Sequence, residues 1–388
     1  MVANPALGVC FHWLGGLASG SFYVPYRAVR RWSWETYWLV GGVFSWIIAP
    51  WFLGSLMTRD LLAVLSETPS RTLFWAFFFG LLWGVGGLTF GLTMRYLGLS
   101  LGMAVVLGLC AALGTLMPPI FRGVFVSEVL GTTSGKTILL GIFVCLAGIS
   151  AAGLAGICKE RAMSPAQQKA VIKEFDLKKG IAVAILSGVM SACFAYGLAA
   201  GAPIKAITLK HGTTALWQGL PVLVVVLVGG FTTNVVWCIA LNIRNKTGYQ
   251  YFRSDSTRGS SDLKETIIET AIDAPSREVV EHIPSRERKD RKSAPMLANY
   301  LLCALAGTTW YFQFFFYTMG ETQMGRFGFS SWTLHMASII IFSTLWGLGL
   351  KEWKGSGAPA MRLLTVALFL LVGSTAIVGY GNYLGLAR

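Results

Sequence analysis

The chain has 388 residues, of which 54% are hydrophobic and only 13% are charged. Soluble domains carry about 25% charged residues, so the composition argues against the two or three soluble domains that this length would otherwise suggest. A net charge of +14 would suit a nucleic-acid-binding protein, but the basic residues are spread between apolar segments, which argues against that class.

Ten stretches contain no Asp, Glu, Lys or Arg, and the shortest of them has 22 residues. About 20 apolar residues in a helix span the hydrocarbon core of a bilayer. The pattern predicts an all-α polytopic membrane protein with ten transmembrane helices, since none of the stretches alternates like a barrel strand. In chain order they are 1–26, 36–58, 72–94, 96–121, 137–158, 180–204, 211–243, 293–320, 327–350 and 363–387.

The loops between these stretches differ in charge. Of the 32 Lys and Arg residues, 24 fall in the odd-numbered loops, and the other 8 fall in the even-numbered loops and the termini. Basic loops stay on the cytoplasmic side, so both termini are expected outside the cytoplasm. The long loop 243–295 is interpreted as a solvated linker with one short amphipathic helix near 262–273, and a regulatory or partner-binding role is the alternative.

Two features bear on processing and cofactors. The opening residues, MVANPALGVC, lack the basic region of a cleaved signal peptide. The seven cysteines lie in or beside the apolar stretches without a CxxC pair, so they are interpreted as packing residues and not as a disulfide or metal framework. No catalytic residues, metal or other cofactor are expected.

Part of the sequence repeats. GLASGSF at 16–22 recurs as GVMSACF at 188–194, and a weaker match relates 83–98 to 310–325. The two offsets, 172 and 227, differ by 55, which is about the length of the loop 243–295. A repeat unit of five spans inverts the second half, as in many secondary transporters with a substrate site between the halves. The predicted repeats are 1–179 and 180–388, the second being interrupted by 243–295.

Ionisable side chains inside spans are rare and mark functional sites. His12 shares a helical stripe with Gly16, Ser19 and Tyr23, and counting along the spans places it level with three other polar residues, roughly 10 Å below the outer surface. Imidazole and amide groups beside aromatic rings suit an uncharged, polyhydroxylated ligand. The alternative for each histidine is a purely structural role. The predicted substrate-binding residues are His12, Tyr23, Trp83, Gln218, Trp310, Gln313, Tyr317, Trp332 and His335.

Proton coupling needs a group that gains and loses a proton. Histidine, with a reference pKa near 6.5, is the first candidate, which selects His12 and His335. Glu35 could instead pair with Arg95 when the cytoplasmic side is closed and take up a proton when that contact breaks. The alternatives are a salt-bridged interfacial Glu35 and an Arg95 that only ends its helix at a tight hairpin. Glu321 is similarly ambiguous, with Arg326 five residues on.

Five segments resemble the L-rhamnose–proton symporter family of the drug/metabolite transporter superfamily. They are FHWLGGLASGSFYVPYRAVRRWSWETYW at 11–38, FGLTMRYLG at 90–98, YFQFFFYTMG at 311–320, WTLHM at 332–336 and LKEW at 350–353. The resemblance implies a ten-helix inverted-repeat carrier that takes up L-rhamnose with protons across a bacterial inner membrane. The positions matching the family are His12, Tyr23, Trp34, Glu35, Arg95, Gln313 and His335.

Other functions are weighed against this one. Another carrier of the superfamily, for a different sugar or small metabolite, coupled to sodium or working as an exporter, is the alternative. A membrane enzyme would need a motif such as HExxH, paired intramembrane aspartates or a Ser/His dyad, and the sequence has none of these. The expected partners are a sugar and the lipid bilayer, without nucleic acid, and the sequence leaves the oligomeric state open.

Overall fold

The structure is a computed structural model that describes residues 3–162, 176–254 and 293–386, and within these ranges it leaves out the side chains of Arg95 and Leu99. All regular structure in these ranges is helical. The helix expected near 262–273 lies outside them. The elements are α1 (Pro5–Ser21), α2 (Tyr23–Tyr26), α3 (Trp34–Gly42), η1 (Val43–Ile48), α4 (Ala49–Met57), α5 (Leu61–Glu67), α6 (Ser70–Leu97), α7 (Leu99–Phe121), η2 (Phe125–Leu130), α8 (Thr133–Arg161), α10 (Leu177–Ala200), α11 (Ala202–Lys210), η3 (Ala215–Trp217), α12 (Leu220–Asn245), η4 (Gly248–Tyr251), α14 (Met296–Gln323), η5 (Gly325–Ser330), α15 (Ser331–Gly349) and α16 (Gly357–Leu386).

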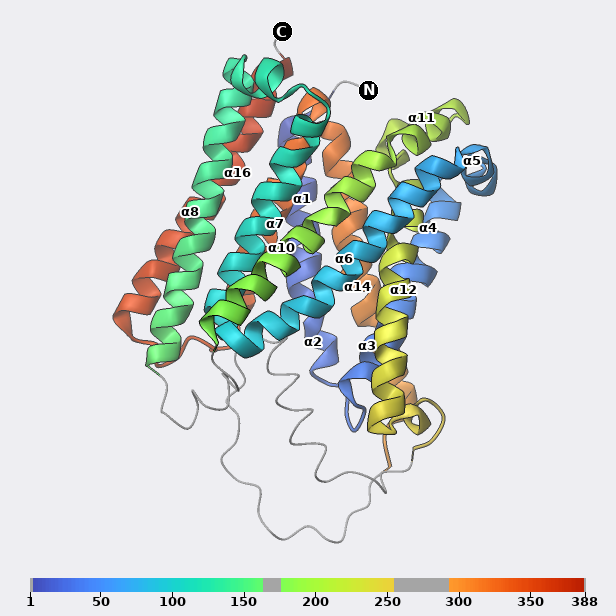
Figure 1. Ribbon diagram of the computed structural model, residues 1–388, viewed down its shortest axis with the longest axis vertical. Helices are drawn as coiled ribbons and strands as arrows, with labels where there is room; N and C mark the ends of the chain where they lie inside the picture. Colours follow the sequence, from blue (N-terminus) through green and yellow to red (C-terminus); the bar gives the residue numbers. More distant parts are fainter. Residues whose placement is uncertain (1–2, 163–175, 255–292, 387–388) are drawn as a thin grey trace.

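The long helices run roughly along one common direction, and the two chain ends lie at the same end of the molecule (Figure 1). Within the described ranges, eight helical segments are long and apolar enough to cross a membrane. The two predicted spans outside this set coincide with α1, which has 17 residues, and α14, which has 28. The protein is therefore a multi-pass, all-helical membrane protein.

Local chemistry accounts for where several helices begin and bend. Asn4 caps α1 by accepting a hydrogen bond from the Leu7 amide, with Pro5 in the first turn. Pro50 cannot donate to the carbonyl of Trp46 one turn earlier, and the π-helical turn η1 lies just before it. The predicted stretch 211–243 is helical only from Leu220, because its first residues form a turn and η3.

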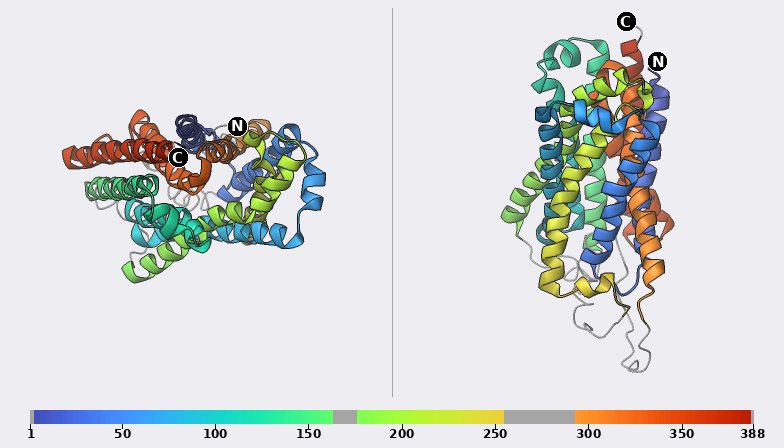
Figure 2. Two further views of the ribbon diagram at one scale, coloured as in Figure 1. Left: turned by 90° about the horizontal axis from the view of Figure 1, so that it is seen from above. Right: turned by 90° about the vertical axis from the view of Figure 1, so that its right-hand side faces the viewer.

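The helices pack around two inner helices, α1 and α10. α1 lies between α14 and α15, while α10 lies between α6 and α7. α12 packs on α6 and on α3, and α8 packs along α16 at one flank of the molecule (Figures 1 and 2). Each of the two inner helices, α1 and α10, is thus held by a pair of helices from the other half of the chain.

Glycines on α1 set how closely these helices approach. A Cβ atom on Gly16 would lie 2.4 Å from Cβ of Ser338 on α15, and one on Gly15 would lie 2.8 Å from the carbonyl oxygen of Gln313 on α14. Small residues allow such backbone contact between helices in lipid, where the hydrophobic effect does not drive association. Because these glycines have no side chains, α1 fits closely between α14 and α15.

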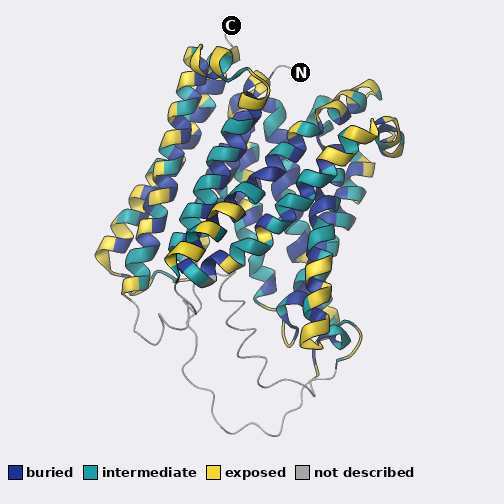
Figure 3. Cartoon of the chain, viewed as in Figure 1, coloured by how far each residue is buried: buried dark blue, intermediate teal, exposed yellow. Residues whose placement is uncertain are grey.

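Burial follows the same arrangement. The most buried residues belong to the central helices, whereas the outward faces carry exposed residues (Figure 3). Many of these exposed residues are large and apolar, such as Phe369 at 76% and Phe52 at 65% exposure. In water such a surface would be costly, but in a bilayer it faces hydrocarbon.

We expect Gly16→Val to destabilise the protein, because the new side chain overlaps Ser338 and overpacking costs about 1–3 kcal/mol. Thermal unfolding in detergent, followed by size-exclusion chromatography of the heated protein, measures the effect as a lower midpoint. Gly373→Ala on α16 is the control, since a Cβ there meets nothing within 4 Å. An unchanged midpoint for Gly16→Val would show that the α1–α15 contact is looser than described.

Candidate functional site

Four aromatic side chains from three helices form a compact group in the core, called here the histidine cluster: His12, Tyr317, Trp332 and His335. The ring of Tyr317 lies 5.3 Å, centroid to centroid, from both imidazoles and 5.8 Å from the ring of Trp332. His335 also lies 5.9 Å from Trp332. The structure thus brings together four of the predicted substrate-binding residues.

The two histidines of the cluster are fully buried, at 0% exposure. Both ring nitrogens of each lack a hydrogen-bond partner among the residues that the structure describes. Leaving buried polar groups unpaired costs free energy, so nearly all such groups in proteins are paired. Four unpaired nitrogens in one cluster therefore indicate a place where a polar ligand, water or proton binds.

The backbone fixes where each histidine stands. A Cβ on Gly320 would lie 2.7 Å from Nε2 of His12, so the imidazole rests directly on α14. The hydroxyl of Ser338 lies 2.9 Å from the carbonyl oxygens of both His12 and His335 and shares its single proton between them, which ties α1 to α15 at this level. The indole of Trp332 donates to the Cys110 carbonyl at 3.0 Å, and this bond orients the cluster's largest ring.

The two predicted glutamines lie near the cluster in different ways. Gln313 is one helical turn before Tyr317 on α14, is 4% exposed, and its Nε2 has no partner within the described ranges. Gln218 is half-buried in the turn before α12 rather than inside that helix. Its neighbour Gly219 packs against Thr318, so Gln218 lies at the cluster's level, although no direct contact joins it to a histidine.

A column of aromatic rings continues from the cluster along α14. Phe314 lies 5.6 Å from His335, 4.0 Å from Phe194 and 5.1 Å from Trp310. Trp310 in turn lies 5.8 Å from Trp83. The predicted residues Trp83 and Trp310 are thus connected to the histidine cluster through Phe314, and they belong to the next level of the core.

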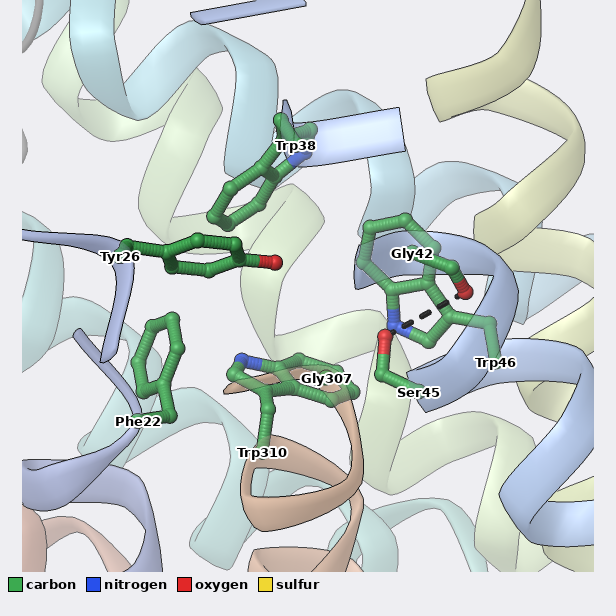
Figure 4. A pocket seen from close by; sticks show the side chains of 8 residues that line it. All are labelled: Phe22, Tyr26, Trp38, Gly42, Ser45, Trp46, Gly307 and Trp310. Carbon is green, nitrogen blue, oxygen red and sulfur yellow. Dashed lines mark hydrogen bonds between the residues drawn. The ribbon is translucent and has the colours of Figure 1, made fainter. Parts of the chain in front are cut away.

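Beyond Trp310 lies a small hollow, the aromatic pocket, which Figure 4 shows from close by. It is formed where α2, α3 and η1 meet α14, and its free volume is small, about 10 Å³. That is room for about one water molecule. Its lining residues are Phe22, Tyr26, Trp38, Gly42, Ser45, Trp46, Gly307 and Trp310.

Tyr23, predicted as a substrate-binding residue, packs behind this pocket against Phe22 and Trp38 and does not reach the histidine cluster.

Glu35 lies at the opposite end of the molecule from the chain termini, in the first turn of α3, and is 2% exposed. Its Oε1 accepts hydrogen bonds from Thr247 Oγ1 at 2.7 Å and from Asn245 Nδ2 at 3.1 Å. Its position at a helix N-terminus favours a negative charge. The hydrogen bonds join α3 to the end of α12, and Arg95, the other predicted gating residue, has its side chain outside the description.

Thr247 extends the Glu35 network to Asn242. Thr247 Oγ1 also lies 2.9 Å from Asn242 Oδ1, and a hydroxyl has a single proton to donate. Asn242 cannot turn its amide around, because its Nδ2 donates to the Cys238 carbonyl and to the Tyr251 hydroxyl. Thr247 thus joins Glu35 to Asn242 in one buried network between α3 and α12.

Ionic contacts join the helices at the end that carries the termini. Lys205 on α11 pairs with Glu321 on α14 at 2.7 Å, so the partner of Glu321 is Lys205, while Arg326 lies over the ring of Phe327. His211 lies 3.2 Å from Glu67 and 3.5 Å from Asp60. The hydrogen bond with Glu67, assisted by Asp60, raises the pKa of His211 above its usual value.

Sequence reasoning missed several residues of this core, above all Trp46, Phe194 and Phe314. A signal was present for Trp46, which falls in the middle of the stretch 36–58, whereas tryptophans usually gather at the ends of spans. The two phenylalanines carried no such signal, because phenylalanine is common throughout apolar spans.

Comparison with known proteins agrees with this architecture. The family model of the L-rhamnose-proton symport protein matches residues 1–250 and 290–384. Proteins named L-rhamnose-proton symporter from Mannheimia succiniciproducens, Cronobacter sakazakii and Yersinia pestis are each 34% identical to the chain over 376 residues, which cover 97% of both sequences. Match and coverage extend over both halves of the molecule and include the histidine cluster, the aromatic pocket and the Glu35 network. The chain therefore belongs to the L-rhamnose-proton symport protein family.

Proposed function

We propose that the protein takes up L-rhamnose together with protons across a bacterial inner membrane; the relatives it matches are named L-rhamnose-proton symporters. The observation that carries the proposal is the histidine cluster with its four unpaired nitrogens, buried between α1, α14 and α15. The proton is the coupling ion, and no other cofactor is needed. A carrier of another sugar, or one coupled to sodium, is the competing function.

The site's chemistry suits an uncharged sugar. Neutral imidazoles can donate at one nitrogen and accept at the other, and the amide of Gln313 can do both, which matches the hydroxyls of a sugar. The rings of Tyr317, Trp332 and Trp310 offer flat surfaces to its C–H faces. Within the described core, Lys or Arg does not approach the cluster in any recorded contact, which disfavours a phosphorylated substrate.

An inverted repeat of five plus five helices underlies this proposal, with halves 1–179 and 180–388. The packing supports it: the contact of Gly15 with the Gln313 carbonyl on α14 corresponds, at the sequence offsets 172 and 227, to Ser187, whose hydroxyl donates to the Gly86 carbonyl on α6 at 2.9 Å. Gly16 and its equivalent Gly188 likewise pack on α15 and α7. α1 and α10 then exchange roles when the two halves are exchanged.

The same repeat places the cluster between moving parts. In alternating access, one set of helices rocks against the other around a central site. The Glu35 network and the ion pairs at the opposite end hold the helices together beyond the two ends of the aromatic column. Breaking one set while the other stays closed would expose the site to one side at a time.

We assign the coupled proton to Glu35, because it is a buried carboxyl group whose partners are the neutral donors Asn245 and Thr247. His12 and His335 are the second candidates, since their unpaired nitrogens can take a proton from the other side. Arg95 is proposed to hold Glu35 ionised in the alternate state. Loss of the Glu35 proton to the cytoplasm would then weaken the α3–α12 contact and release the sugar.

Topology is tested first. The 24 basic residues in odd-numbered loops lead us to expect both termini outside the cytoplasm and the 243–295 loop inside. Alkaline phosphatase fused after residue 388 should be active, and a fluorescent protein that folds only in the cytoplasm should be bright when inserted near residue 270. The reverse pattern would overturn the orientation and the assignment of Glu35 to the cytoplasmic side.

Substrate binding is tested with Gln313→Ala. Loss of one hydrogen bond to the sugar costs about 0.5–1.5 kcal/mol, so Kd for L-rhamnose should rise several-fold in calorimetry on purified protein. Gln323→Ala on the same helix is the matched control, because that buried side chain accepts from the Asn4 amide at the chain start. Equal affinities of wild type and Gln313→Ala would remove Gln313 from the site.

Coupling is tested in proteoliposomes by comparing proton-driven accumulation with counterflow exchange, which needs no net proton movement. Glu35→Gln keeps the hydrogen-bonding shape but cannot release a proton, so it should retain exchange and lose accumulation. Glu128→Gln in η2, which takes part in neither set of contacts, is the control and should retain both. If Glu35→Gln accumulates sugar normally while His12→Gln does not, the histidine carries the proton, and accumulation driven by a sodium gradient alone would refute proton coupling.

A further inference from the structure

The segment that follows α12 folds back onto the start of α3, where Glu35 lies. Residues 246–254, called here the η4 segment, begin at Lys246, whose φ of 55° turns the chain away from α12, and they contain η4. The segment lies at the end of the molecule opposite the termini, where α12 ends (Figure 1). Glu35 is 2% exposed, whereas its partner Asn245 is exposed. One layer of side chains therefore separates the carboxyl group from water.

The side chain of Gln250 holds the η4 segment against α3. Its Oε1 accepts from the backbone amide of Ser33 at 2.7 Å and lies 3.0 Å from the Ser33 hydroxyl. Ser33 is the N-cap residue of α3, and its own side chain makes no cap bond to the helix. In a capping box, a Glu or Gln three residues into the helix bonds to the N-cap amide, but that position is Thr36 here. Gln250 supplies this bond from 217 residues away.

Further contacts fasten the η4 segment to other helices. The hydroxyl of Tyr300 on α14 donates to the Tyr251 carbonyl at 2.6 Å, and Asn242 on α12 donates to the Tyr251 hydroxyl at 2.9 Å. Thr247, inside the segment, lies 2.7 Å from Oε1 of Glu35. The η4 segment thus connects α3, α12 and α14 and contributes one of the partners of Glu35.

The described groups around Glu35 are neutral. Its hydrogen-bond donors are Asn245 and Thr247, and the titratable groups that face it from other elements are the Cys238 thiol on α12 and the Tyr251 phenol. Thiols and phenols have reference pKa values of about 8.5 and 10, so both keep their own protons where carboxyl groups titrate. Among these groups a proton leaving Glu35 finds no acceptor, and it must pass to water.

We propose that Gln250 is a positioning residue for proton release, whose bonds to Ser33 keep the η4 segment closed over Glu35 until the proton leaves. This inference rests on the proposed function, in which Glu35 carries the coupled proton. A closed segment prevents a proton that arrives through the centre of the molecule from crossing without sugar. Loss of one neutral hydrogen bond shifts such an equilibrium several-fold, so without the Gln250 side chain the segment should open several-fold more often.

Access to Glu35 is tested on the purified protein with a water-soluble carbodiimide, which couples to protonated carboxyl groups, followed by mass spectrometry of the peptide that contains Glu35. Gln250→Ala should be labelled there several-fold faster than the wild type. Asn299→Ala is the matched control, because the buried Asn299 amide bonds to the amide and the carbonyl of Arg30 at the same end of the molecule. It should keep the wild-type rate.

A milder variant keeps the test valid if Gln250→Ala does not fold. Tyr300→Phe removes only the bond to the Tyr251 carbonyl, and it should also speed the labelling of Glu35. Wild-type labelling rates in both variants would overturn this inference and leave the proposed function standing.

The consequence for coupling is tested in proteoliposomes without sugar, by following the collapse of an imposed pH gradient. Gln250→Ala should collapse the gradient several-fold faster than the wild type, and adding Glu35→Gln should abolish this leak. A leak from general loosening of the bundle would persist in the double variant. A leak that is absent, or that persists in the double variant, overturns this inference alone. Normal sugar accumulation by Glu35→Gln overturns it together with the assignment of the coupled proton.

Discussion

The centre of the molecule depends on how closely α1 approaches α14 and α15. In lipid this contact is held by van der Waals packing rather than by the hydrophobic effect, so it forms only where side chains are absent. Gly15 and Gly16 allow the backbones to meet, and Gly320 leaves the space that the His12 imidazole fills. A side chain at any of these positions would displace His12 from Tyr317 and disrupt the histidine cluster.

Close packing also explains why the histidine cluster carries a free-energy cost. Its buried nitrogens are held by neighbours that offer no complementary groups in the described core, and unpaired polar atoms cost more the drier their surroundings are. In the proposed function, a sugar that supplies hydroxyls would relieve this cost only in the conformation that admits it. It would thereby stabilise one state over another, which is the physical requirement for driving a conformational change.

The two ends of the molecule differ in chemistry as well as position. At the end with the termini, charged pairs such as Lys205–Glu321 join α11 to α14 near the surface. At the other end, Arg27 pairs with Glu352 at 2.8 Å, and a buried carboxyl group with neutral donors joins α3 to α12.

Much of this protein could be predicted from the sequence because lipid imposes strict rules on chain segments. The absence of charge over at least 22 residues predicted the helical segments, and the rarity of ionisable groups in spans singled out His12 and His335. The helix starting at Leu220 was predicted too early, because hydropathy does not distinguish an apolar turn from a helix. Spacing along single helices also predicted that Tyr317 and Trp332 lie near the level of the histidines, and their rings are 5.8 Å apart.

Tertiary structure alone decided which groups meet across helices. Tyr23, on the same helical stripe as His12 in sequence, packs against Phe22 and Trp38 behind the aromatic pocket, because eleven residues along the chain separate it from His12 by about 16 Å. In the sequence, Glu35 stands close to Arg30 and Arg31. In the structure its carboxyl group accepts hydrogen bonds from Asn245 and Thr247, more than 200 residues away. Trp46 borders a pocket built by three separate segments. Periodicity fixes the face of one helix, but contacts between helices depend on their relative rotation and depth, which are set by the packing of the whole bundle.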